Sequence, residues 1–405
     1  MVYLEYTINE VQFMKNKLWT LLLVIAMVAL IGMRFTAAPA QVKVADTLFI
    51  DDVMTVRMGN RYGIINKNGE FVVEPEYQQL YPFTNNGLAV AQIDGKWMYV
   101  NTKGETVIEP GFETIVSFND RGLAIVMNES KMGVINEKGE VVIEPKYNII
   151  NGLNGDEYAV ASIDGEWGVI NNKGETIVEP KYRNAFPFNG NELAPVNEYG
   201  VYGFIDREGN MVIDPQFAHA WSMKNGFARV AVDDYTSTPV MKWGFVDESG
   251  NLLGEAVYEM VNDFDSSGLA AVKTGSAWGY INTSGEMVIE PQFANAGSFE
   301  DGKAVVLTKD GFGVINTKGE YIIEPKYEYL GEFSNGLATV QNGSKICYIN
   351  IDDEIVIEPE FDGNYAEVAH PFKDDGYAIV IINDKYGVID KEGNFILEPI
   401  YDSLR

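Results

Sequence analysis

The sequence predicts an all-β protein built as a tandem array of about ten units of roughly 35 residues each. One phrase recurs along the chain at a nearly constant step: an aromatic residue, then Gly-Val-Ile-Asn, two variable residues and a second Gly. The apolar residues are mostly Val, Ile, Tyr and Phe in short runs between turn signals, which is typical of β-strands. We therefore expect one repeat array over residues 41–405.

The first glycine of the phrase marks the register of the units. It is present in eight units and replaced in two. The ten positions are Gly63, Met98, Gly133, Gly168, Gly203, Gly244, Gly279, Gly313, Cys347 and Gly387.

Turn signals inside one unit predict a three-stranded antiparallel meander. In residues 87–112, Asp94-Gly95 is a hairpin dipeptide between two strand-like runs. The segment from Asn101 to Gly104 fits a type I turn before a third run, which Pro110 should end because it has no N–H to donate. A meander of this size cannot bury its apolar face alone, so neighbouring units must stack.

Two architectures satisfy this pattern. Propellers typically have 4–8 blades, and ten units exceed that range. The sequence therefore favours an open, solenoid-like superhelix. Propeller-like closure into one or two rings stays open as the alternative.

Residues 1–40 have the parts of a secretory signal peptide. An uncharged, apolar stretch from Leu18 to Met33 follows Lys15 and Lys17 and precedes an Ala-x-Ala site that ends at Ala40. The preceding lysines place the N-terminus in the cytoplasm and the array outside. We expect an extracellular or cell-surface protein, exported by a cleaved signal peptide. The alternative is a single-pass signal-anchor with the array outside the membrane.

The charge balance excludes one class of partner. The formal net charge is -29, a field that repels phosphate backbones. We expect no nucleic-acid partner. An acidic surface also favours a soluble monomer.

The residues that usually carry chemistry are scarce. Cys347 is the only cysteine, and the two histidines, His219 and His370, lie in different units and share no motif. No nucleophile–base set, multi-thiolate metal site or phosphate loop can be assembled. The sequence therefore predicts no enzyme, no cofactor, no metal site and no catalytic residue.

The combined motif resembles the bacterial WG repeat, also called KWG. Trp167-Gly168-Val169-Ile170-Asn171, followed by Glu179-Pro180-Lys181-Tyr182, shows the pattern most fully. The resemblance covers ten units, nearly all of the chain after the signal segment. It implies a binding or structural repeat and supplies no catalytic residues.

The function predicted is therefore a protein-binding or structural scaffold at the cell surface. The alternative is a cell-wall or glycan-binding module in which repeated aromatics stack on sugar rings. The candidate stacking residues are Trp97, Trp167, Trp243 and Trp278. Aromatics flanked by Val and Ile are more often part of an inter-unit core, and we favour that interpretation for this column. A specific function is also expected where the period breaks, at Asp233–Val240 and around Asp362–His370.

Overall fold

The computed structural model describes residues 46–109, 111–153, 156–233, 241–361 and 364–405. All of them belong to one compact unit, Val42–Arg405. The expected signal peptide or anchor at residues 1–40, its cleavage site and Pro110 lie outside the described residues. Within the described ranges, no helix is long and apolar enough to cross a membrane.

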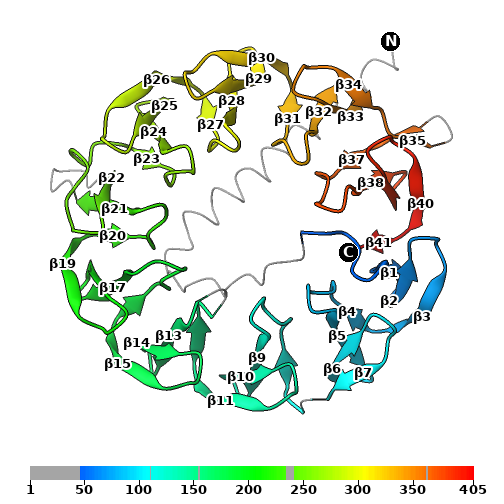
Figure 1. Ribbon diagram of the computed structural model, residues 1–405, viewed down its shortest axis with the longest axis horizontal. Helices are drawn as coiled ribbons and strands as arrows, with labels where there is room; N and C mark the ends of the chain where they lie inside the picture. Colours follow the sequence, from blue (N-terminus) through cyan, green and yellow to red (C-terminus); the bar gives the residue numbers. More distant parts are fainter. Residues whose placement is uncertain (1–45, 110, 154–155, 234–240, 362–363) are drawn as a thin grey trace, which may run out of the picture. The chain divides into compact units, whose positions relative to one another are not determined.

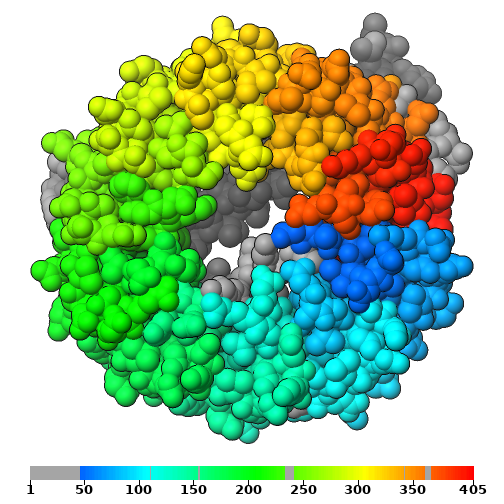
Figure 2. Space-filling view, in the orientation of Figure 1, coloured from blue at the N-terminus to red at the C-terminus, as the bar shows by residue number. Residues whose placement is uncertain are grey.

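The unit is a closed ring of ten small antiparallel sheets, or blades, numbered here from the N-terminus (Figure 1). Blade 1 has the strand order β41-β1-β2-β3, blade 2 β4-β5-β6-β7, and the following blades repeat this order. Blade 6 contains only β20-β21-β22, and a small extra hairpin, β35-β36, lies between blades 9 and 10. Figure 2 shows the blades side by side around a central opening.

The strands of each blade run from the inner edge of the ring outward. The innermost strands are β41 (Ser403–Leu404), β4 (Gln79–Leu80), β8 (Thr114–Ile115), β12 (Ile149–Asn151), β16 (Asn184–Ala185), β20 (His219–Ala220), β23 (Met260–Val261), β27 (Asn295–Ala296), β31 (Tyr329–Leu330) and β37 (Val368–Ala369). The second strands are β1 (Val53–Met58), β5 (Leu88–Ile93), β9 (Leu123–Asn128), β13 (Tyr158–Ile163), β17 (Ala194–Glu198), β21 (Phe227–Asp233), β24 (Leu269–Thr274), β28 (Lys303–Thr308), β32 (Ala338–Asn342) and β38 (Ala378–Ile382).

The third strands carry the recurring phrase, and the outermost strands carry the Glu-Pro dipeptides. The third strands are β2 (Arg61–Asn66), β6 (Lys96–Asn101), β10 (Lys131–Asn136), β14 (Glu166–Asn171), β18 (Val201–Ile205), β22 (Met241–Asp247), β25 (Ala277–Asn282), β29 (Gly311–Asn316), β33 (Lys345–Ile349) and β39 (Lys385–Ile389). The outermost strands are β3 (Phe71–Tyr77), β7 (Thr106–Ile108), β11 (Val141–Tyr147), β15 (Thr176–Tyr182), β19 (Met211–Phe217), β26 (Met287–Phe293), β30 (Tyr321–Tyr327), β34 (Ile355–Ile357) and β40 (Phe395–Tyr401). The extra hairpin is β35 (Glu360–Phe361) and β36 (Asn364–Tyr365).

The favoured open superhelix is wrong, and the alternative, closure into one ring, is what the chain adopts. The C-terminal strand β41 pairs with β1, joining Leu404 to Val56 and Ser403 to Arg57. Backbone hydrogen bonds from Thr55 to Arg405 and back, at 3.1 and 3.0 Å, extend this ladder. The last residues therefore complete the first blade, and both ends of the array find a partner (Figure 1).

Each regular blade also has one strand more than the three predicted. The additional, innermost strand comes from the connection after Pro-x-aromatic, for example Gln79–Leu80 after Tyr77. Most of these strands are two residues long, too short to show an alternating pattern in the sequence.

The third and outermost strands pair through a β-bulge opposite the first glycine of the phrase, which the sequence did not predict. In blade 4, Trp167 pairs with Tyr182 and Val169 with Val178, so three residues oppose Gly168. A Cβ on Gly168 would lie 2.3 Å from the carbonyl oxygen of Val178. The glycine is therefore needed for close approach. The sequence predicts that Pro ends this strand, but in seven blades the outermost strand runs through its Pro, as β15 does through Pro180. In blade 2 the strand ends at Ile108. The Pro limits pairing at this free edge.

The two units without the glycine show the consequence of a side chain in that slot. Opposite Met98 and Cys347, the outermost strands β7 and β34 are three residues long and end at Ile108 and Ile357. The other outermost strands are seven residues long. Cys347 itself is fully buried, as a small core residue would be.

The apolar core lies between blades. One cluster combines Val134, Ile143 and Tyr147 of blade 3 with Ala159 and Ile170 of blade 4. Each sheet buries side chains on both faces against its neighbours, so no blade has a complete core of its own. The Asn and Asp column forms the predicted turns: Asn66 Oδ1 accepts the N–H groups of Asn68 and Glu70, each at 3.0 Å.

Candidate functional site

The loops between the innermost and second strands gather at one edge of the ring. We call each the inner loop of its blade; that of blade 2 runs from Tyr81 to Gly87, between β4 and β5. Inner loops and the Asn-x-x-Gly turns lie at the same end of each antiparallel sheet. They therefore form one face of the ring, and neighbouring inner loops meet there.

In seven seams between blades, an inner-loop side chain hydrogen-bonds the backbone just before or within the inner loop of the next blade. We call these contacts clasps. In four clasps an Asn side-chain amide donates to a backbone carbonyl: Asn119 to Leu153 at 3.0 Å, Asn191 to Met223 at 2.6 Å, Asn225 to Phe264 at 2.7 Å and Asn335 to Phe372 at 3.3 Å. In the other three an Asp carboxylate accepts from backbone N–H groups: Asp156 from Gly190 at 2.9 Å, Asp265 from Phe299 at 2.7 Å, and Asp375 from Leu48 and Phe49 at 2.9 Å.

The clasp between blades 4 and 5 contains a buried ion pair. The side chain of Asp156 is 1% exposed and pairs with Arg207 Nη1 at 3.3 Å. It also accepts the N–H groups of Tyr158 and Gly190. Burying a carboxylate without partners would cost free energy, so these three partners hold Asp156 and the two loops together at the seam.

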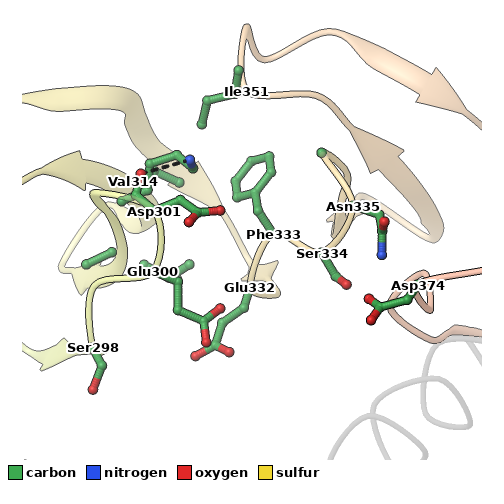
Figure 3. Close-up of a pocket in the computed structure, with 14 residues that line it drawn as sticks. Ser298, Glu300, Asp301, Val314, Glu332, Phe333, Ser334, Asn335, Ile351 and Asp374 are labelled. Carbon is green, nitrogen blue, oxygen red and sulfur yellow. Dashed lines mark hydrogen bonds between the residues drawn. The ribbon is translucent and has the colours of Figure 1, made fainter. Parts of the chain in front are cut away.

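Three seams have no clasp among the described residues: those between blades 1 and 2, blades 2 and 3, and blades 8 and 9, and the second of these has a side-chain bond from Asn85 to Asp120 at 3.2 Å. The seam between blades 8 and 9 is the one beside the best-defined cavity. Both of its inner loops are fully described, and no hydrogen bond joins one to the other. In its place there is a cavity of about 480 Å³, lined by residues of both loops (Figure 3).

Two substitutions in a common turn accompany this gap: blade 8 carries Glu300 and Asp301 where blade 9 carries Ser334 and Asn335, the two donors to blade 10. The inner loops of blades 6, 8 and 9 end in two-residue hairpin turns, with Asn225-Gly226, Asp301-Gly302 and Asn335-Gly336 at positive φ. The Asn amides of blades 6 and 9 donate to the next blade. Asp301 holds the same turn, but an ionised carboxylate has no hydrogen to donate to a carbonyl.

The cavity combines acidic and apolar walls. Its carboxylates are Glu300, Asp301, Glu332 and Asp374, and its apolar lining includes Phe333, Val305, Val314 and Ile351. Figure 3 shows Phe333 in the middle of the lining, with the carboxylates around it.

The four carboxylates are available to a ligand. Each residue is exposed, and none of their side chains makes a hydrogen bond or ion pair with the described residues. Lys303 is the one cation in the lining, and its Nζ donates to the carbonyl oxygen of Asp301 at 3.1 Å. No group of His, Cys, Asp and Glu among the described residues could hold a metal ion. The chemistry of the cavity suits a larger cation with an apolar stem.

The tryptophans predicted as stacking residues lie on four different blades and form no common surface. Trp167 on blade 4 and Trp278 on blade 7 are 6% and 7% exposed. Trp97 on blade 2 and Trp243 on blade 6 are half-buried, beside Tyr81 and His219 respectively.

Of the two breaks in the period, the first lies mostly outside the described residues, at 234–240. The second contains β36 and β37, with residues 362–363 outside. Sequence reasoning missed the cavity at blades 8 and 9. Its one signal was Asp301-Gly302 where blades 6 and 9 have Asn-Gly.

The repeat can now be compared with known proteins. The family model described as "WG containing repeat" matches residues 62–97, 97–131, 132–167, 167–201, 202–235, 243–276, 278–311, 312–345, 348–386 and 386–405. The chain belongs to the WG-repeat family. All ten matches begin in the third strand of a blade, and seven of them end in the third strand of the next, so these WG repeats straddle two blades.

Solved structures match the chain at low sequence identity. A structure titled "Crystal structure of the eukaryotic initiation factor" is 9% identical, covers 87% of this chain and 98% of its own, and has a TM-score of 0.52. A dipeptidyl peptidase 4 of Porphyromonas gingivalis is 9% identical, covers 78% and 58%, and has a TM-score of 0.44. No curated protein matches the WG-repeat chain. The likeness to the first structure shows the fold alone.

Proposed function

We propose that this WG-repeat protein is a non-enzymatic scaffold, exported to the cell surface, that binds a basic segment of a protein partner. The observation that carries the proposal is the cavity between blades 8 and 9. Four carboxylates without partners in the described residues surround an apolar floor there. A lysine or arginine side chain would place its methylenes on Phe333 and its charge among the carboxylates.

The rest of the molecule supports a binding role. The net charge of -29 would draw a basic segment toward the ring before contact, at a rate that falls with ionic strength. The C-terminal strand pairs with β1 inside one ring, and the Pro in most outermost strands limits pairing with a second copy at the free edges. This supports a monomeric scaffold. The segment at residues 1–40, with its pattern of a signal peptide or anchor, motivates the cell-surface placement.

The test is a calorimetric titration of the full chain with a ten-residue lysine-rich peptide and with the same peptide fully acetylated on its lysines. We expect binding of the charged peptide that weakens with salt, and no binding of the acetylated one. The triple variant Glu300→Gln, Glu332→Gln, Asp374→Asn should lose about tenfold in affinity, because three partly exposed charge pairs contribute about 0.2–1 kcal/mol each.

The matched control is Glu248→Gln. Glu248 is exposed in the turn of blade 6 on the same face, and its side chain makes no hydrogen bond or ion pair with the described residues. It tests whether any acidic residue on this face matters equally. Equal losses in the control and the triple variant would mean that the peptide responds to net charge only, and the proposal would fail.

A further inference from the structure

A second cavity, of about 140 Å³, lies where blades 10, 1 and 2 meet. We call it the blade 1 cavity. Its lining includes Thr47, Leu48 and Ile50 before β1, Phe83 in the inner loop of blade 2, Lys373 in the inner loop of blade 10, and Arg405 after β41. The seam between blades 1 and 2 is one of the three without a clasp among the described residues.

The blade 1 cavity lies where the ring is closed. In the other blades a continuous inner loop joins the innermost strand to the second strand, as Tyr81–Gly87 joins β4 to β5. In blade 1 these strands come from opposite ends of the array, so no such loop joins Leu404 of β41 to Val53 of β1. Arg405 and Thr47, on the two sides of this interruption, both line the cavity. The cavity therefore lies where the other blades have a connecting loop.

The walls of the blade 1 cavity are apolar. Val53, Met54 and Phe83 are 6%, 1% and 4% exposed, and Leu48 and Ile379 are half-buried. A buried water needs about two to four polar partners, which such walls do not supply. An apolar cavity of roughly 150 Å³ holds one benzene molecule. The blade 1 cavity therefore has room for a single six-membered aromatic ring.

The charged residues of the lining are both cations. The guanidinium carbon of Arg405 lies 5.3 Å from the centre of the Tyr62 ring, so this charge already has a neighbour in blade 1. Lys373 is half-buried, and its side chain makes no hydrogen bond or ion pair with the described residues. Its ammonium is therefore available to a ligand.

The two acidic residues that follow Lys373 have other neighbours. Asp374 lines the cavity between blades 8 and 9, and Asp375 accepts the N–H groups of Leu48 and Phe49. The net charge of -29 repels anions from a distance, but at about 0.15 M salt this field is screened beyond roughly 8 Å. The charges that border the cavity therefore decide the sign of the ligand, and Lys373 favours an anion.

We propose that the blade 1 cavity binds a small aromatic carboxylate. Its ring would lie among Leu48, Val53 and Phe83, where an edge-to-face contact with the Phe83 ring is favourable. Its carboxylate would pair with the ammonium of Lys373 at the edge of the cavity. The same ring with an ammonium group would meet a like charge at this position.

This inference does not depend on the proposed function. The cavity between blades 8 and 9 is lined by four carboxylates, whereas the blade 1 cavity has none in its lining. The two sites should therefore select ligands of opposite charge.

The experiment titrates the full chain with three ligands that share one ring: benzoate, benzyl alcohol and benzylamine. Binding is followed by ligand-observed NMR up to about 10 mM ligand in about 0.15 M salt, because a ligand of this size binds weakly. We expect benzoate to bind best, benzyl alcohol about two- to fivefold more weakly, and benzylamine weakest despite the negative charge of the chain. Lys373→Met keeps the apolar stem and should lower the affinity for benzoate to that for benzyl alcohol, which should not change.

Matched variants separate the charge of Lys373 from its packing. Lys224 directly follows the buried Met223 in the inner loop of blade 6, as Lys373 follows a buried residue in blade 10, so Lys224→Met should leave benzoate binding unchanged. Ile50→Phe places a ring in the cavity and should abolish binding of benzoate and benzyl alcohol but not of the lysine-rich peptide. Asp301→Asn should leave benzoate binding unchanged. Circular dichroism of each variant verifies the fold.

The inference is overturned if benzoate does not bind, or if benzyl alcohol or benzylamine binds the parent chain as well as benzoate does. It is also overturned if Lys373→Met leaves the preference for benzoate intact, or if folded Ile50→Phe binds benzoate as well as the parent. Failure of the lysine-rich peptide to bind, with benzoate binding as expected, would contradict the proposed function and leave this inference standing.

Discussion

The inner loops of blades 8 and 9 contain the same two-residue turn. The turn of blade 9 hydrogen-bonds to the next blade, whereas the turn of blade 8 lies beside a cavity. In the first, Asn335 Nδ2 and Ser334 Oγ both donate to the carbonyl oxygen of Phe372, at 3.3 and 2.6 Å. In the second, Asp301 takes the place of Asn335 and a cavity of about 480 Å³ separates the loops. Blade 8 thus carries two carboxylates, Glu300 and Asp301, where blade 9 carries the two donors of its clasp.

The core beneath the two seams is alike, so the difference is confined to the loops. Under the cavity, Val314 and Tyr327 of blade 8 pack with Leu330, Val340 and Ile349 of blade 9. The ring is held by these interfaces, and the clasps add to them. This separation lets one seam exchange a clasp for a ligand site without opening the ring.

The largest effect is expected where a clasp is also a buried ion pair. Asp156→Ala leaves Arg207 without its buried partner and removes the acceptor of Gly190 N–H. Arg207 keeps Glu192 and the carbonyl oxygen of Asn191 as partners, so the expected cost is that of one buried donor left unsatisfied, about 1–3 kcal/mol. Chemical denaturation should show a clearly lower midpoint. A midpoint within experimental error of the parent would show that the clasp contributes nothing to the seam.

A smaller loss is expected when a clasped seam is converted into an open one. Asn335→Asp keeps the turn but removes the donor to Phe372, which keeps its bond from Ser334. The net loss of one hydrogen bond is about 0.5–1.5 kcal/mol. The denaturation midpoint should fall modestly, and a crystal structure should show the loops of blades 9 and 10 further apart. Asn335→Ala is the control for the amide without the added charge.

The reverse substitution should close the open seam. Asp301→Asn restores the donor and removes one of four neighbouring carboxylates. We expect a stability gain of up to about 1 kcal/mol. The control is Asp301→Ser, which removes the charge without reaching across the seam. If both variants gain equally, charge repulsion and not a new clasp is the cause.

The smallest effect is expected for the pH dependence of stability at the seam between blades 10 and 1, which closes the ring. The ammonium of Lys385 on blade 10 and the N–H of Gly59 hold the pKa of Asp402 below its usual range. A carboxyl group with a lowered pKa stabilises the fold fully above its unfolded pKa of about 3.9, and this is lost as the pH falls through the folded value. The stability difference between the parent and Asp402→Asn should therefore shrink from pH 7 to pH 3. A difference independent of pH would contradict this role.

The repeat count, the strand-forming runs and the Asn turns could be predicted because they depend on residues that are close together in the sequence of each unit. Ring closure could not, because it depends on the accumulated rotation between blades and on pairing across the whole chain, as between Leu404 and Val56. The bulge opposite Gly168 was missed for a similar reason. A glycine that permits close approach and a glycine that forms a turn look the same in a sequence.

The candidate site was harder to predict than the fold. The aromatic column suggested stacking residues, yet its local flanks do not say which rings face a neighbour and which face solvent. Asp301 and Asn335 are interchangeable as turn formers. Only the position of the next loop shows that one of them must donate a hydrogen bond and that the other leaves a cavity.

The most direct test of the central claim is the affinity of the lysine-rich peptide for the parent chain and for Asp301→Asn, measured by calorimetry under identical salt. The account predicts that Asp301→Asn closes the loops of blades 8 and 9 and weakens binding by about tenfold, more than the loss of one exposed charge explains. Unchanged affinity in this variant, with its fold intact, would contradict the claim that the open seam is the binding site.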